Sequence, residues 1–105
     1  MPMLKTLASV DMTGLASQAA VELGETPFQL GGNCIMHMTA PIGGAGVITV
    51  EGSPDGTTNW TTVRTINAAQ SAGQVVEITN LPPWIRTRVS TVGTGTIVPT
   101  LEGVQ

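Results

Sequence analysis

The residues closest to a metal-binding or catalytic pattern are Cys34 and His37, three positions apart. A zinc site needs three or four ligands, and this chain contains one cysteine and one histidine. In a strand, side chains three positions apart also point to opposite faces. We therefore expect a packed thiol, an ordinary imidazole, and neither a metal ion nor any other cofactor.

Other catalytic patterns also lack the residues that they need. Nucleophilic catalysis requires a base beside a Ser, Thr or Cys, and no carboxylate stands next to His37 in the sequence to orient it. The run Gly43-Gly44-Ala45-Gly46 has neither the Lys-Ser/Thr pair nor the helix of a phosphate-binding loop. Asp55 and Asn59 share a loop that lacks the alternating ligands and final Glu of a calcium loop. The sequence therefore predicts no enzymatic activity and no small-molecule substrate.

The chain carries few charges for its 105 residues. Asp, Glu, Lys and Arg make up 10% of it, whereas about 25% is typical. Four basic against seven acidic residues argue against nucleic-acid binding, which needs clusters of Lys and Arg. We expect no signal peptide and no membrane partner, because no apolar run has the required length.

The low charge also bears on assembly. A monomer in solution normally covers its surface with Lys, Glu and Arg. We therefore expect part of this surface to be covered by other chains, copies of itself included. The alternative is a sandwich coated with Thr, Ser and Gly that needs no partner.

The composition favours strands, since Thr, Val and Ile supply about a third of the residues and are β-branched. Strands are predicted over residues 33–39, 47–51, 60–66, 74–80, 84–92 and 96–102, and a first strand begins within residues 18–23. About seven short antiparallel strands separated by turns predict an all-β chain that forms a single small β-sandwich, immunoglobulin-like or jelly-roll-like. An open barrel is the alternative.

Turn residues predict how some of these strands pair. Ser53-Pro54-Asp55-Gly56 suits a type I turn, so residues 46–66 should form a hairpin with a polar tip. Gly93-Thr94-Gly95 predicts a second hairpin, which joins the last two strands. Pro99 cannot donate to a ladder, so we expect the final strand to lie at an edge or to pair on one side only.

The first 24 residues show no clear periodicity. Their large apolar residues, which include Leu4, Leu7 and Leu15, fit neither the helical nor the strand period. We therefore expect residues 1–17 to form an extended N-terminal arm and residues 18–105 to form the sandwich domain.

The predicted strand 84–92 carries the best candidate contact surface. Its alternation places Trp84, Arg86 and Arg88 on one face. Trp and Arg often contribute most of the energy of an interface, and Arg can bind a partner's carboxylate through two hydrogen bonds. The alternative is that Trp84 caps the core while both arginines are solvated. Trp60 is expected to pack in the core.

Two stretches of the sequence resemble a known class of proteins. They are Val47-Ile48-Thr49-Val50-Glu51-Gly52-Ser53-Pro54-Asp55-Gly56 with Trp60, and Leu81-Pro82-Pro83-Trp84-Ile85-Arg86-Thr87-Arg88-Val89-Ser90. Over residues 45–103 the sequence pattern resembles that of small virion structural proteins of tailed bacteriophages, above all head-decoration (capsid cement) proteins.

This resemblance implies a non-enzymatic protein that binds the outside of an assembled capsid. Its partners would be the major capsid protein, whose neighbouring subunits it bridges to stabilise the shell, and copies of itself. It would be located on the virion surface after assembly in the host cytoplasm. The expected contact residues are Met1, Met3, Leu4, Leu7, Trp84, Arg86 and Arg88.

Two other functions share the same features. A tail, adaptor or baseplate component would also be rich in strands and low in charge. A carbohydrate- or receptor-binding module of the virion would use an exposed aromatic residue such as Trp60.

Overall fold

The computed structural model describes residues 2–24 and 28–104, with side chains for residues 3–24 and 28–103, and these residues form a β-sandwich. The elements in chain order are β1 (Pro2–Thr6), β2 (Val10–Asp11), β3 (Val21–Glu22), β4 (Cys34–Met38), β5 (Val47–Ser53), β6 (Thr61–Asn67), α1 (Ala68–Ser71), β7 (Val75–Ile78), β8 (Trp84–Thr91), β9 (Thr96–Ile97) and β10 (Pro99–Val104). This confirms the prediction of an all-β sandwich.

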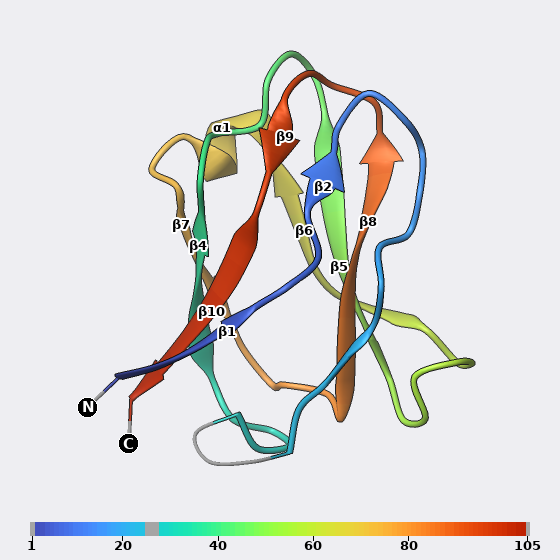
Figure 1. The fold of residues 1–105 in the computed structure, drawn as a ribbon, viewed down its shortest axis with the longest axis vertical. Coiled ribbons are helices and arrows are strands. Elements are labelled where there is room, and N and C mark those ends of the chain that lie inside the picture. The colour runs from blue at the N-terminus through green and yellow to red at the C-terminus, as the bar shows by residue number, and fades with distance from the viewer. Residues whose placement is uncertain (1, 25–27, 105) are drawn as a thin grey trace.

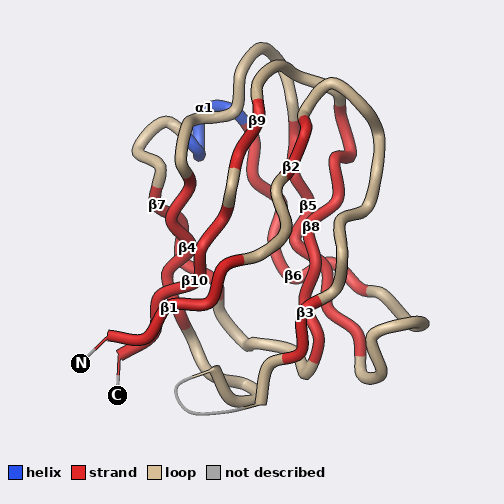
Figure 2. The backbone as a smooth tube through the Cα atoms, in the orientation of Figure 1, coloured by secondary structure: helices blue, strands red, loops and turns tan. Residues whose placement is uncertain are grey.

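The strands form two four-stranded antiparallel sheets and one small ribbon (Figures 1 and 2). The first sheet has the strand order β1-β10-β4-β7, and the second has the order β3-β8-β5-β6. The ribbon pairs β2 with β9. The predicted hairpin over residues 46–66 is confirmed, because β5 and β6 pair in antiparallel register.

The core lies between the two sheets and follows from the alternation of their strands. On β8 the inward residues Ile85 and Val89 are buried, while their neighbours point outward. On β4 the inward residues Cys34 and Met36 are buried, and Ile35 between them is exposed. Burial of these side chains stabilises the fold by about 1.5 to 3 kcal/mol for each large one.

Cationic side chains close both open sides of the sandwich. Lys5 on β1 donates from Nζ to the carbonyl oxygen of Glu22 on β3, over 3.0 Å. Arg64 on β6 donates from Nη1 to the carbonyl oxygen of Glu77 on β7, also over 3.0 Å. Each bond joins an edge strand of one sheet to the facing edge strand of the other.

The prediction of an N-terminal arm over residues 1–17 needs correction. Residues 2–17 belong to the sandwich: β1 pairs along β10, a turn at residues 12–13 follows β2, and Leu7, Val10 and Met12 are buried in the core. The chain then runs beside β8, where the Val89 amide donates to the carbonyl oxygen of Ala16. The irregular spacing of these apolar residues hid the burial, because Val10 lies in a strand of two residues while Leu7 and Met12 lie outside the strands.

The last strands also pair differently from the prediction. Residues 93–95 do not form a hairpin, because β8 lies in one sheet while β10 lies in the other. Pro99 does not mark an edge either, since β10 pairs with β1 on one side and β4 on the other. The proline is tolerated because it is the first residue of its strand, where a missing amide hydrogen interrupts no ladder.

Candidate functional site

An unusual polar cluster lies on the outward face of β5 and β8, away from the core. In this register Glu51 lies opposite Arg86, and Thr49 lies opposite Arg88. The alternation of β5 directs Ile48 and Val50 into the core and therefore directs Thr49 and Glu51 outward. Both outward residues are nevertheless buried, because neighbouring long side chains cover them.

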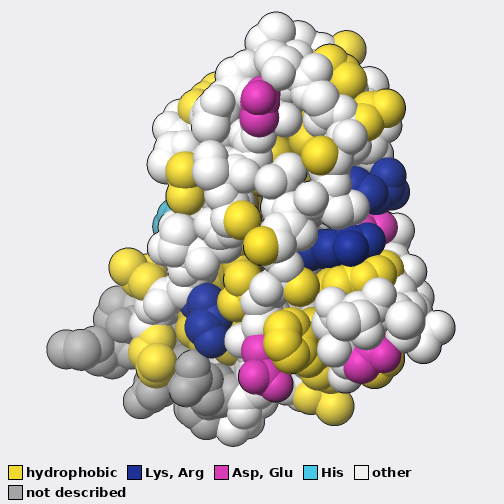
Figure 3. All heavy atoms as spheres, turned by 45° about the vertical axis from the view of Figure 1, so that its right-hand side comes forward, with side chains coloured by type: hydrophobic (Ala, Val, Ile, Leu, Met, Phe, Trp, Pro, Cys, Tyr) yellow, Lys and Arg dark blue, Asp and Glu magenta, His cyan; other side chains and the backbone are white. Residues whose placement is uncertain are grey.

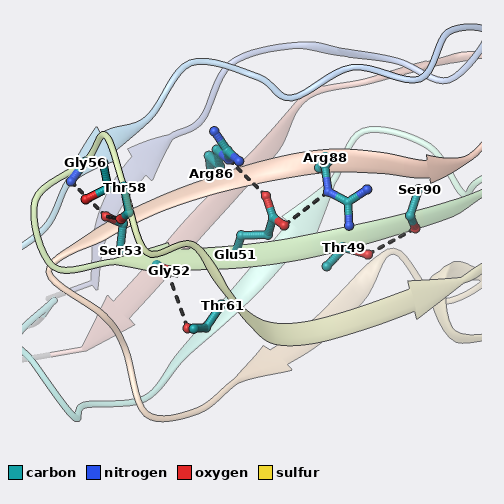
Figure 4. Close-up of polar contacts among 10 residues, drawn as sticks. All are labelled: Thr49, Glu51, Gly52, Ser53, Gly56, Thr58, Thr61, Arg86, Arg88 and Ser90. Carbon is teal, nitrogen blue, oxygen red and sulfur yellow. Dashed lines mark hydrogen bonds and ion pairs between the residues drawn. The ribbon is translucent and has the colours of Figure 1, made fainter.

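Glu51 binds two arginines at once. Its Oε1 accepts a hydrogen bond from Arg86 Nε at 2.9 Å, and its Oε2 accepts one from Arg88 Nε at 3.1 Å (Figure 4). The Glu51 side chain is 10% exposed, that of Arg86 21% and that of Arg88 40%. One carboxylate therefore faces two guanidinium groups, and the cluster has a net charge of about +1 because arginine stays protonated.

Trp60 completes this group, which we call the Glu51 cluster: Glu51, Trp60, Arg86 and Arg88. The Arg86 guanidinium lies 3.9 Å from the centre of the Trp60 ring, the geometry of a cation–π contact. The prediction that Trp60 packs in the core is wrong, because the residue is half-buried just before β6 on the outward side. Its ring holds Arg86 in place instead of filling the core.

The hairpin tip next to the cluster is tightly ordered by Asp55. Its Oδ1 accepts hydrogen bonds from the backbone amides of Thr57 and Thr58, at 2.9 and 2.8 Å. Hydrogen bonds, that from the Thr58 hydroxyl foremost, hold the pKa of Asp55 well below its usual value. Gly56, at a φ of 82°, lies so close to the Trp84 ring that a Cβ would sit 2.6 Å from it. The tip therefore covers Trp84.

The outward face of the first sheet is a second candidate surface. It carries three large exposed hydrophobic residues, Leu4, Ile35 and Val75, at 66%, 41% and 49% exposure. In register, Leu4 and Ile35 flank Glu102, while Val75 lies beside His37. We call these five residues the Leu4 face.

His37 Nε2 and Glu102 Oε1 are hydrogen-bonded to each other on the Leu4 face. Glu102 lies 65 positions from His37, so no local pattern could reveal this carboxylate partner. Within residues 2–24 and 28–104, no Ser, Thr or Cys side chain hydrogen-bonds to the ring. Among the described residues, the pair therefore lies on the surface without a hydroxyl or thiol partner.

A groove of about 510 Å³ lies at the end of the sandwich near the hairpin base. Pro54, Pro82 and Pro83 form rigid apolar walls, and Asn59 and Asn80 supply amides. Both asparagines have positive φ, near 57° and 58°, a conformation that asparagine tolerates better than most residues. The groove contains no charged side chain among the described residues that line it.

The contact residues predicted from the sequence are only partly brought together. Trp84, Arg86 and Arg88 do share one face, as the alternation predicted. Leu4 is exposed, whereas Leu7 is buried and cannot reach a partner without unfolding. Met3 is partly buried against the core. Met1 lies outside the described residues.

Glu51, the centre of the cluster, is not among the contact residues predicted from the sequence. The signal was present, because an acidic residue in a strand of alternating apolar residues must point outward, as Arg86 and Arg88 do on their own strand. The sequence does not reveal that β5 pairs with β8. This pairing places Glu51 beside Arg86 and Arg88, from which it is separated by 35 and 37 positions along the chain.

Comparison with known proteins gives no relative: no family model matches the chain, and no curated protein sequence is similar to it. Among the described residues, no helix is long and apolar enough to cross a membrane. Nor does the described part of the chain bring together three His, Cys, Asp or Glu side chains that could hold a metal ion.

Proposed function

We propose that the protein is a non-enzymatic structural protein of a virion, which binds the outside of an assembled phage capsid and bridges neighbouring major capsid subunits. The proposal starts from the resemblance of residues 45–103 to head-decoration proteins. The observation that supports it best is the Leu4 face, where three exposed hydrophobic residues lie on one sheet surface.

The Leu4 face has the properties of a surface that associates with another protein. Half of the six large hydrophobic residues exposed in the described chain lie on this sheet, and exposed apolar groups gathered on one face often mark interaction sites. On this face His37 and Glu102 are hydrogen-bonded to each other, and Glu77, opposite Ile35 in register, is a further exposed carboxylate. Weak contacts of this kind add up when many copies bind one lattice.

A tail, adaptor or baseplate role would use the same surface and is the alternative. The carbohydrate-binding alternative is less well supported, because Arg86 stacks on the Trp60 ring. A sugar would have to displace that guanidinium from this face of the ring in order to stack there.

The test combines location with a variant of the Leu4 face. Particles are purified, the chain is quantified against the major shell protein, and its position is imaged. Leu4→Lys, opposite Glu102 in register, should lower retention on particles at least tenfold. Leu30→Lys is the matched control, because Leu30 is 74% exposed but lies on a different part of the surface.

The outcomes separate the alternatives. A ratio near stoichiometric with density on the capsid exterior supports the proposal. A few copies confined to the tail or a vertex would replace it with the tail or adaptor role. Absence of the protein from every particle would contradict the proposed function. Equal retention of the two lysine variants on particles would contradict the proposed face.

A further inference from the structure

We infer that the Glu51 cluster is a binding site for an acidic side chain of a partner protein, with Arg88 as the main donor. This inference stands independently of the proposed function, since it uses a different face of the molecule and requires no capsid. Figure 3 shows basic side chains on this side of the molecule with hydrophobic side chains beside them.

Half of the basic residues of the chain lie in the Glu51 cluster. The chain has four basic residues, and two of them, Lys5 and Arg64, bond to backbone carbonyl groups across the open sides of the sandwich. The other two share a single carboxylate. In the described part of the chain, the Glu51 cluster is therefore the place where two guanidinium groups lie together with a single carboxylate, on a protein whose net charge is −3.

The arginines of the Glu51 cluster keep N–H donors that Glu51 does not use. A guanidinium group has five N–H donors in a plane, and Glu51 binds only the Nε of each arginine. The terminal nitrogens of Arg86 and Arg88 point away from Glu51 (Figure 4). Arg88, 40% exposed, can therefore present two further N–H groups to a second carboxylate in the paired geometry that arginine favours.

Both arginines are already held in position. Arg86 is fixed between Glu51 and the Trp60 ring, and Arg88 is fixed by the other oxygen of Glu51. Because these donors are already ordered, little side-chain entropy is lost when a ligand binds them.

A hollow lies beside Arg88. It measures about 300 Å³ and is lined by Leu15, Ala16, Ser17, Arg88, Val89 and Ser90. Leu15 is 68% exposed there. An apolar wall next to a guanidinium fits a Glu or Asp followed by an apolar residue, and it fits a nucleic-acid phosphate poorly on this acidic protein.

The experiment uses a defined peptide probe, acetyl-Gly-Glu-Leu-Glu-Leu-Gly-amide, and a matched peptide in which both Glu are Gln. Tryptophan fluorescence is the readout, because both tryptophans of the chain lie on this face. The acidic peptide should bind at least tenfold more tightly than the Gln peptide, and its affinity should fall as salt is raised.

Variants locate the site. Arg88→Gln should weaken binding of the acidic peptide at least tenfold, and Lys5→Gln, which removes the same charge on the other sheet, should change it less than twofold. Equal binding of the two peptides by the wild-type protein would overturn the inference, and this comparison needs no variant to fold. Equal effects of Arg88→Gln and Lys5→Gln would also overturn it, because net charge alone would then explain binding.

Discussion

At the scale of single residues, the molecule uses its few charges inside specific contacts. Glu51 receives one N–H from each of two arginines while its own side chain is 10% exposed. Hydrogen bonds to charged groups contribute about 1.5 to 3 kcal/mol each when they are shielded from water. A cluster of this kind stabilises the pairing of β5 with β8, and its excess charge is available to a partner.

Glu51→Gln tests this contribution to stability. The substitution keeps the shape of the side chain but leaves two guanidinium groups facing a neutral amide, so unfolding free energy should fall by about 2 to 3 kcal/mol. Urea unfolding followed by circular dichroism measures the change. Glu77→Gln is the control, because Glu77 is exposed on β7, and it should stay within about 0.5 kcal/mol of the wild type. A loss that small for Glu51→Gln would contradict a stabilising role.

Cys34 gives a prediction on pH. Burial on the inner face of β4 raises the pKa of its thiol from 9.0 to about 11. Because the folded pKa is the higher one, this thiol contributes stability that is fully present below pH 9 and is lost as the pH rises from 9 towards 11. The chain has no tyrosine, so comparison with Cys34→Ala isolates the effect: the wild type should lose more stability over this interval. Parallel curves would contradict the prediction.

At the scale of elements, the close approach of two loops lets the chain pass from one sheet to the other. Thr94 and Gly43 exchange backbone hydrogen bonds of 3.1 and 3.3 Å. A Cβ on Gly93 would lie 2.8 Å from the Gly46 Cα. Backbone atoms cannot rotate away as a side chain can, so this crossing requires glycine for reasons of space.

Gly93→Ala should therefore destabilise the protein by about 1 to 3 kcal/mol, the usual cost of forcing extra atoms into a packed site. Gly73→Ala is the matched control, because a Cβ there meets nothing within 4 Å and the residue does not have a positive φ. The control should leave stability unchanged or raise it by up to about 1 kcal/mol. Thermal unfolding of both variants measures the difference, and equal midpoints would show that the loops can separate without cost.

The elements also show how far the sequence could predict the fold. Alternation and turn residues located β4, β5, β6, β7 and β8, because each has one face in the core and one outside. They could not show that residues 93–95 carry the chain between sheets, since a Gly-Thr-Gly turn suits a hairpin equally well. The alternation also placed Arg86 and Arg88 on one face, but their partner Glu51 depends on a pairing across more than 30 residues.

At the scale of the whole molecule, the two ends of the described chain lie together in the first sheet. Pro2 lies opposite Val104 in the register of β1 with β10, and the ends emerge side by side (Figure 1). The sandwich is therefore closed by a pairing between strands that are almost the full chain length apart. Such long-range pairings form late in folding because their loop-closure entropy is large.

Deleting residues 2–12 should therefore prevent cooperative folding. The deletion removes Leu7, Val10 and Met12, which are buried, and burial of each contributes about 1.5 to 3 kcal/mol to a domain whose net stability is about 5 to 15 kcal/mol. A circular permutant is the control: a short glycine linker joins residue 104 to residue 2, and new ends open at Gly73, where space is free. The permutant keeps every core residue and should unfold cooperatively. If the deleted chain instead unfolds cooperatively with a loss below about 1 kcal/mol, residues 2–12 are an arm and the core is complete without them.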